Sequence, residues 1–362
     1  MDFDLSDDQL ALRDGAQSLL DDLSAPDRVR RIAESPERWD RDLWAAMVDQ
    51  GWLGIAVPEP EGGVGLGPVE LGVLLEEIGR HVSPAPFLPT VLALEIFRRV
   101  GDVRAVERVL AGDLRACIAW SRNADAVRAE RAGSEWELTG RTDPVPYASI
   151  ADLAIVFAVD ADGPALFAVD LDLIGRPAAE PAMDLTRPIA WLDLVATPAW
   201  RLGGADLASA LLDLGATATA LELLGGADRV LELAVGYAKE RVQFGRPIGS
   251  FQAVKHRCAD MLVDVEGMRS SAYWAAWCLA ADDPDQSIAA STAKTWGSDA
   301  SKRVMASSLQ VHGGIGFTWE HDLHLFLKRA QLDQLSFGDA VFHRDRLAAL
   351  LRPKVDAGDS VI

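Results

Sequence analysis

The stretch YAKERVQFGRPIGSFQAVKHRCADM, from Tyr237 to Met261, decides how the rest of the chain is organised. Its glycines and proline predict a tight loop between the end of one long helix and the start of another. Arg241, Phe244 and Gln252 place a cation, an aromatic ring and a long amide around that loop. A guanidinium binds phosphate oxygens bidentately, and a ring stacks on a flat heterocycle. The stretch therefore predicts a site for a planar ligand that carries a pyrophosphate.

A second glycine-rich stretch, SLQVHGGIGFTWEHDLHLFLKRA, follows about 55 residues later. Gln310 lies at the end of a predicted helix, and Gly313, Gly314 and Gly316 come directly after it. Glycines at a helix end let backbone N–H groups approach a phosphate or a ribose closely. A glycine-rich helix end without any ligand would explain the same pattern.

The flanking segments predict an α+β fold with segregated layers. Helical patterns fill residues 1–112, beginning with a capping box at Ser6-Asp7-Asp8-Gln9 and including one pattern over 88–110. Residues 113–203 contain short apolar runs separated by Asp, Gly and Pro, which predicts a β domain. Residues 204–362 return to long helices, at 207–239, 252–281 and 287–310. No βαβ alternation and no strand followed by G-x-G-x-x-G is visible, so a Rossmann site is not supported.

Composition narrows the classes of function. The 362 residues are 49% apolar, which predicts a folded chain with a large core. The formal net charge of -20 argues against nucleic-acid and anionic-membrane partners, which require a basic face. Three cysteines without a CxxC pair indicate reduced thiols, and the N-terminus has no signal-peptide pattern. We expect a soluble cytoplasmic protein.

The pair ERVQFGRPIGSFQAVKH and QVHGGIGF resembles the acyl-CoA dehydrogenase family, and the helix, β, helix order agrees with it. The resemblance implies a helical N-terminal domain, a β-barrel-like middle domain, a C-terminal four-helix bundle, FAD as cofactor and a tetramer. It also implies an acyl-CoA substrate and an electron-accepting flavoprotein partner. In such a family the positions that contact the flavin nucleotide, often that of a neighbouring subunit, match Arg241, Phe244, Gln252, Gln310, Gly313 and Gly314.

The chain departs from the family where the catalytic base is expected. The implied reaction removes the α-proton of an acyl thioester with a carboxylate while the β-hydrogen leaves as hydride to the flavin. The commoner position of that carboxylate matches Phe337, and the alternative position matches Gly215. Neither residue can act as a base.

The middle-domain loops that resemble flavin contacts in the family are also altered. They read Ala119-Trp120-Ser121-Arg122-Asn123-Ala124 and Pro144-Val145-Pro146-Tyr147-Ala148-Ser149. Some bacterial members that shorten steroid-CoA side chains are heterotetramers of two unlike chains with fewer complete sites than chains. This sequence resembles the incomplete chain of such a pair, with the base supplied by its partner.

Two alternatives stay open. A carboxylate could have moved within a self-sufficient homo-oligomer, with Glu222, Asp213 and Asp339 as the candidates, although a helical carboxylate is more often an ion-pair partner. The chain could also be a non-catalytic structural subunit. A metal site is not predicted, because His321 and His324 lack the remaining ligands of a full set.

Overall fold

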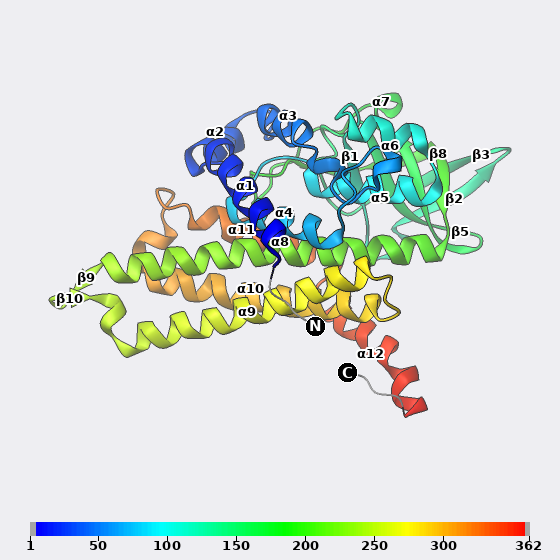
Figure 1. Cartoon of the computed structure of the whole chain (residues 1–362). Helices are drawn as coiled ribbons and strands as arrows, with labels where there is room; N and C mark the ends of the chain where they lie inside the picture. Colours follow the sequence, from blue (N-terminus) through cyan, green and yellow to red (C-terminus); the bar gives the residue numbers. More distant parts are fainter. Residues whose placement is uncertain (1–4, 359–362) are drawn as a thin grey trace. The chain divides into compact units, whose positions relative to one another are not determined.

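The computed structural model describes residues 5–358 (Figure 1). The chain forms two compact units, each assembled from separate stretches of sequence. One unit combines the residues up to 26 with 68–83 and 216 onward, and the other combines 27–67 with 84–215. The domain boundaries predicted after residues 112 and 203 divide the chain by local pattern and stay a prediction.

The first unit begins with the predicted capping box. The backbone N–H of Gln9 donates to the Ser6 hydroxyl at 3.2 Å, and that of Ser6 donates to Gln9 Oε1 at 3.0 Å. These bonds satisfy two N–H groups that a helix start otherwise leaves without partners, and so begin helix α1, Asp7–Leu23. Gln9 Nε2 also donates to Glu70 Oε1 at 2.7 Å, which ties α1 to α4, Pro68–His81.

The C-terminal helices confirm the predicted helical region to within a few residues at each end. They are α8 Ala205–Glu240, α9 Gln252–Ala280, α10 Gln286–His312, α11 Leu323–Leu335 and α12 Ala340–Ala357, with the 3-10 turns η4 Ile248–Ser250 and η5 Gly313–Phe317. Helix α8 alone among the described residues is long and apolar enough to cross a membrane, but 72% of its most apolar window is buried. That burial is typical of a core helix in a soluble protein.

Helices α4 and α8 touch backbone to backbone at two glycines. A Cβ placed on Gly225 would lie 1.8 Å from the carbonyl oxygen of Glu76, and one placed on Gly79 would lie 2.1 Å from that of Glu222. Any larger residue at either position would have to push the helices apart. The two glycines therefore set how closely α4 approaches α8.

The second unit contains helices and a small barrel. Its helices are α2 Pro26–Glu34, α3 Arg41–Asp49, α5 Phe87–Val100, α6 Val103–Leu110 and α7 Leu171–Ile174, with the 3-10 turns η1 Trp52–Gly54, η2 Glu59–Glu61 and η3 Ala124–Ala126. The helical pattern over 88–110 is interrupted in the structure. Gly101 adopts φ of 75° and ends α5, and the Asp102 side chain then caps α6.

The strands confirm the predicted β region and close on themselves. They are β1 Ala116–Ala119, β2 Val127–Ala132, β3 Glu135–Arg141, β4 Val145–Pro146, β5 Leu153–Asp160, β6 Gly163–Asp170, β7 Ile189–Ala190 and β8 Asp193–Gly203. The main sheet runs β1-β5-β2-β3-β8-β6, and β6 pairs again with β5. This extra pairing closes β5, β2, β3, β8 and β6 into a barrel-like ring around an apolar core, with β1 paired to β5 alone.

Replacing Gly225 with alanine should lower the free energy of unfolding by about 2–4 kcal/mol, because the new methyl group meets the α4 backbone, which cannot move cheaply. Gly236 is the matched control on the same helix, since no atom lies within 4 Å of a Cβ placed there. Gly236→Ala should instead raise the free energy of unfolding by up to about 1 kcal/mol through helix propensity. Urea unfolding of both variants measures the contrast, and equal effects would refute the close contact.

Candidate functional site

A two-residue hairpin connects α8 to α9 and carries the predicted cation and ring (Figure 1). Strand β9, Val242–Gln243, pairs antiparallel with β10, Arg246–Pro247. Phe244 and Gly245 form the turn with φ of 54° and 75°, the left-handed combination that a type I′ hairpin requires. A bulky residue adopts positive φ only at a cost, which points to a functional demand on this position. The Phe244 side chain is 90% exposed.

Stacked rings bring the two glycine-containing stretches together at one end of the bundle. Tyr237, in the last turn of α8, stacks on His312 at the end of α10, with ring centroids 4.9 Å apart and planes 24° apart. His321, beyond the glycines, meets the same histidine edge-on at 4.5 Å. Burial lowers the pKa of His312, whose Nδ1 lies 2.9 Å from the Ser308 carbonyl oxygen. The ring is therefore neutral and acts as packing between the two stretches.

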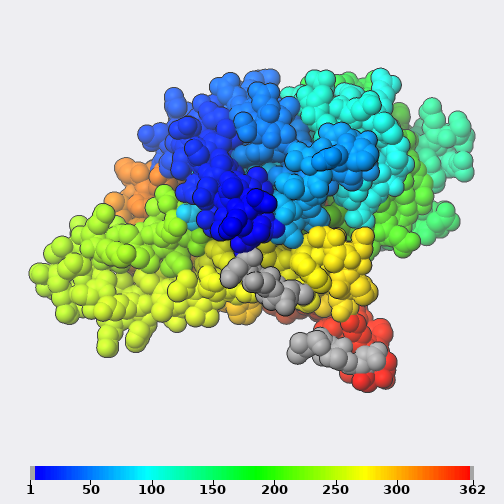
Figure 2. All heavy atoms as spheres, viewed as in Figure 1, coloured from blue at the N-terminus to red at the C-terminus, as the bar shows by residue number. Residues whose placement is uncertain are grey.

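The long polar side chains at this end have no partner inside the chain. Arg241, Gln252 and Gln310 are exposed, and over residues 5–358 their side chains form no hydrogen bond or ion pair. Figure 2 shows the hairpin residues, in yellow-green, at the molecular surface. These three donor side chains and the exposed Phe244 ring are therefore available to bind an external ligand. Of the donors, a guanidinium binds a phosphate best.

The glycine loop offers open space next to these donors. No atom lies within 4 Å of a Cβ placed on Gly313 or Gly314, and Gly313 adopts φ of 63°. A ligand could thus approach the backbone of η5 directly. The residues predicted to contact a flavin nucleotide are therefore compatible with one in exposure and chemistry, although their role as ligand contacts stays a prediction.

The loop where a catalytic carboxylate is expected carries a buried ring. Phe337 is buried, adopts φ of 55°, and its carbonyl oxygen lies 2.8 Å from His343 Nε2. Burial lowers the pKa of His343 to about 3, so this ring is neutral and donates from Nε2. The loop is fixed firmly, but it presents no proton acceptor at position 337.

The buried side chain of Lys294 supports the same loop, which surrounds Phe337. The Lys294 side chain has no solvent exposure, and its Nζ donates to the carbonyl oxygens of Gln334 at 3.0 Å and Gly338 at 2.8 Å. Burial lowers the pKa of this ammonium to about 7. The first bond satisfies a carbonyl group at the end of α11 that has no helical partner, and the second holds the loop that follows Phe337. Lys294 is thus occupied in supporting the loop.

The three carboxylates proposed as a relocated base have different environments. Glu222 forms a fully buried ion pair with Arg329 on α11, with Oε1 2.7 Å from Nη1. Asp339 caps α12 by accepting from the backbone N–H of Phe342 at 2.8 Å. Asp213 is buried within α8. The contacts of Glu222 and Asp339 favour structural roles, and a catalytic role for any of the three stays a prediction.

Residues of the altered middle-domain loops pack into the β domain. Val145, Tyr147 and Ala148 are buried, and the first and last of these belong to the core of the β domain. Ser121 donates to Asp143 Oδ2 at 2.8 Å, which closes the other loop locally. Side chains committed in this way do not face outward to hold a ring system.

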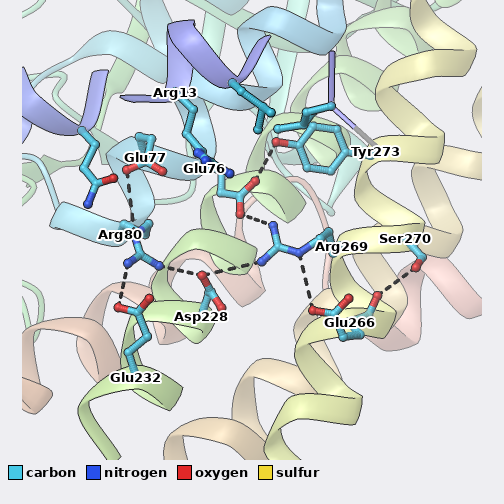
Figure 3. Close-up of a pocket in the computed structure, with 13 residues that line it drawn as sticks. Arg13, Glu76, Glu77, Arg80, Asp228, Glu232, Glu266, Arg269, Ser270 and Tyr273 are labelled. Atoms are coloured by element: carbon cyan, nitrogen blue, oxygen red, sulfur yellow. Dashed lines mark hydrogen bonds and ion pairs between the residues drawn. The ribbon is translucent and has the colours of Figure 1, made fainter. Parts of the chain in front are cut away.

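A cavity of about 780 Å³ lies elsewhere in the first unit, and charged side chains line it (Figure 3). Arg80 on α4 bridges two residues of α8, with 2.6 Å to Asp228 and 2.7 Å to Glu232. Arg269 on α9 pairs with Glu76, which also accepts from the Tyr273 hydroxyl at 2.6 Å. An acyl chain requires apolar walls, so this cavity does not supply an acyl pocket.

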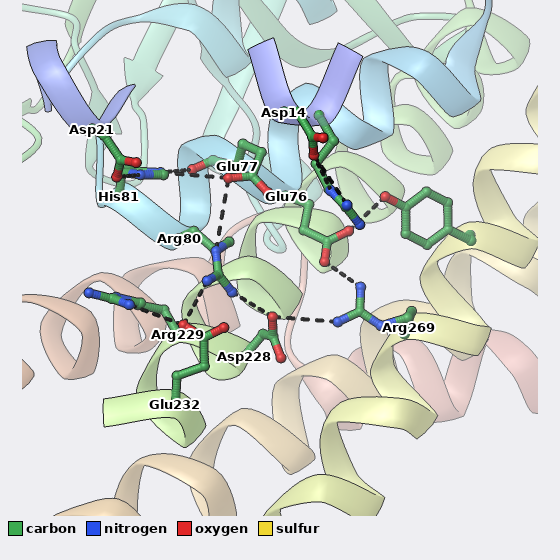
Figure 4. Close-up of polar contacts among 12 residues, drawn as sticks. Asp14, Asp21, Glu76, Glu77, Arg80, His81, Asp228, Arg229, Glu232 and Arg269 are labelled. Carbon is green, nitrogen blue, oxygen red and sulfur yellow. Dashed lines mark hydrogen bonds and ion pairs between the residues drawn. The ribbon is translucent and has the colours of Figure 1, made fainter. Parts of the chain in front are cut away.

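Glu77 is the exceptional carboxylate of this network (Figure 4). It is buried, its Oε2 forms no hydrogen bond, Arg80 Nε lies 3.9 Å from that oxygen, and the His81 ring nitrogen Nδ1 lies 3.8 Å from it. Burial raises the pKa of Glu77 to about 7, since these contacts compensate the charge only in part. Glu77 is not among the residues predicted from the sequence, although the two adjacent acids inside the apolar run VELGVLLEEIG are a signal for it.

Comparison with known proteins gives the following matches. Residues 6–112 match the family model described as "Acyl-CoA dehydrogenase, N-terminal domain", and residues 203–351 match "Acyl-CoA dehydrogenase, C-terminal domain". The acyl-CoA dehydrogenase IpdE2 of Mycolicibacterium smegmatis is 34% identical over 327 residues, which cover 90% of this chain and 93% of that protein.

Two solved structures share the whole fold. One is the ChsE4-ChsE5 complex from Mycobacterium tuberculosis, with a TM-score of 0.90, 31% identity, and coverage of 97% of this chain and 99% of the matched chain. The other is a variant of the Tcur3481-Tcur3483 steroid ACAD, with a TM-score of 0.90, 33% identity, and coverage of 96% and 99%.

Glu77 should make the stability of the protein depend on pH. Its pKa is about 7 in the folded protein against 4.5 when unfolded, so its contribution is complete below pH 4.5 and is lost as pH rises through 7. Glu77→Gln cannot ionise, and should be more stable than the parent by up to about 3 kcal/mol at pH 8 but similar to it at pH 4.5. Urea unfolding at both pH values tests this, and a pH-independent difference would contradict it.

Proposed function

We propose, from the premise that this chain belongs to the acyl-CoA dehydrogenase family, that it is one subunit of a hetero-oligomeric enzyme that desaturates acyl-CoA thioesters. Members of the family are FAD-dependent oxidoreductases. One observation carries the proposal. The exposed donors at the bundle end are ready for a nucleotide, while the position expected to hold the base is a buried phenylalanine.

The chain's own residues would hold the nucleotide portion of the cofactor. Arg241 would pair with the pyrophosphate, Phe244 would pack on a flat ring, and the open backbone at Gly313 and Gly314 would donate N–H groups. When bound, FAD supplies the acceptor for the hydride that leaves the β-carbon of the substrate. The exposed position of these residues suits a flavin that a neighbouring subunit shares.

In this proposal the partner chain supplies the group that removes the proton. A general base has to lie within hydrogen-bond reach of the α-proton, and neither Phe337 nor Gly215 carries an acceptor side chain. The partner is a second, unlike acyl-CoA dehydrogenase chain, and the assembly is a heterotetramer. The similarity to a chain of the ChsE4-ChsE5 complex supports this arrangement.

Exposed apolar side chains on the bundle support association with other chains. Leu262 and Val263 are exposed on α9, Trp296 on α10, and Val341 and Val355 on α12. A net charge of -20 keeps such a surface soluble until a partner covers it. We place the complex in the cytoplasm, with an electron-accepting flavoprotein reoxidising it.

The substrate class we propose is a steroid-CoA intermediate. Its support is the 33% identity to a chain described as a steroid ACAD. The altered middle-domain loops, in which Ser121, Val145 and Tyr147 are buried, are consistent with a site that this chain does not complete alone.

Co-expression with a neighbouring acyl-CoA dehydrogenase gene tests the proposal. The chain purified alone should be colourless and inactive, and the co-purified complex should be yellow and turn over a steroid-CoA with an artificial electron acceptor. Within the complex, Arg241→Ala should weaken FAD binding about 10–100-fold by removing a charge-assisted phosphate contact. Arg104→Ala removes an equal exposed charge from α6 and should change FAD binding little.

Other outcomes point to the alternatives. Full turnover by the chain alone would establish the self-sufficient enzyme. A colourless chain that gains no flavin with any partner would establish the non-catalytic structural subunit.

The buried pair Glu222–Arg329 separates a relocated base from a structural contact. Glu222→Gln should destabilise the protein by about 3–5 kcal/mol, because it removes the carboxylate charge that pairs with the buried Arg329 guanidinium. The double variant Glu222→Leu, Arg329→Met removes both charges and should recover most of the stability. If Glu222 is structural, the double variant in the complex keeps its turnover, whereas a loss of about a thousandfold or more would identify it as the base.

A further inference from the structure

Trp319 stands at the surface immediately after the glycine loop. Its side chain is 67% exposed, which makes it the most exposed tryptophan among residues 5–358. An indole is among the largest apolar side chains, and leaving it in water forgoes the free energy of burial. Its exposure therefore points to something that covers it in the working protein.

The indole is held in a defined orientation. The Lys328 ammonium lies over the ring, 4.0 Å from its centroid, and the His324 ring meets it edge-on at 4.8 Å. His324 and Lys328 both belong to α11, so one helix fixes the orientation of the indole ring. A preorganised aromatic face loses little conformational entropy when a planar ligand stacks on it.

The glycine loop itself places Trp319 near the predicted nucleotide end of the bundle, because Trp319 follows Gly316 by three residues. His321 is two residues further along and packs on His312, which stacks on Tyr237 one turn before Arg241. The same loop contains the open backbone of Gly314. A cation, open N–H groups and a fixed ring are thus gathered within two neighbouring segments.

We propose that Trp319 is a stacking platform for the adenine ring of the dinucleotide, with Lys328 fixing the ring and adding positive charge near the phosphates. The inference rests on the proposed function. It extends that function because it assigns binding of the adenosine half of the cofactor to a residue outside the two motifs ERVQFGRPIGSFQAVKH and QVHGGIGF. Bases stack on aromatic side chains without regard to sequence, so a single exposed indole is sufficient.

Titration of the deflavinated complex with FAD, FMN and ADP tests the assignment by binding alone. Trp319→Ala should weaken FAD and ADP binding about tenfold or more, and Trp319→Phe should recover most of the loss. FMN lacks the adenosine group, so its affinity should not change. Trp200→Ala is the control, since it removes another exposed tryptophan, 42% exposed, from strand β8.

The outcomes separate this inference from the proposed function. If Arg241→Ala weakens FAD binding and Trp319→Ala does not, the stacking assignment is wrong and the proposed function stands. If neither variant affects FAD, the proposed function fails. If Trp319→Ala lowers FMN and FAD affinity equally, or only prevents the two chains from associating, Trp319 is a protein contact and the assignment is wrong.

Discussion

The backbone contact between α4 and α8 is the constraint on which the first unit depends. Two glycines without side chains let the helices approach until carbonyl oxygens nearly occupy the place of a Cβ. At that separation Arg80 reaches Asp228 and Glu232 on α8, and Glu76 reaches Arg269 on α9. Helix α4 thereby becomes part of the C-terminal bundle, and it contacts α8 between Glu222 and Glu232, before α8 reaches the hairpin that we propose binds a nucleotide.

Two buried charged side chains, Glu222 and Lys294, connect neighbouring elements of the fold. Glu222 neutralises Arg329 between α8 and α11, and Lys294 holds the loop around Phe337 by its carbonyl groups. Removing one member of such a pair costs far more than the pair contributes, because it strands the other charge away from water. The fold therefore keeps a rigid loop at the usual position of the base while offering no base there. The polar groups that we propose bind the ligand lie at the hairpin and the glycine loop.

Local sequence patterns predicted much of this fold, but they could not predict the contacts between residues that lie far apart in the sequence. The capping box at Ser6 and the three long C-terminal helices follow from nearest neighbours and apolar periodicity, and both are present. The closure of the barrel depends on β6 pairing with both β5 and β8, which no local pattern reveals.

The residues of the candidate site were likewise predictable where the signal is a local motif, and not where it depends on long-range contacts. The glycines and the cation of the two motifs were recognisable from sequence, and the structure brings their segments together. The roles of Glu76 and Glu77 could not be predicted from the sequence, because the partner of Glu76 on α9, Arg269, lies 193 residues away. Trp319 was passed over because exposure and the neighbouring Lys328 are visible only after folding.

The central claim is that this chain lends residues to a flavin site that it does not complete. Native mass spectrometry of the intact co-expressed complex, with the bound flavin counted against both chains, measures this most directly. The account predicts a complex of two unlike chains with fewer flavins than chains. A complex with one flavin for every chain, or a homo-oligomer of this chain alone saturated with flavin, would contradict it.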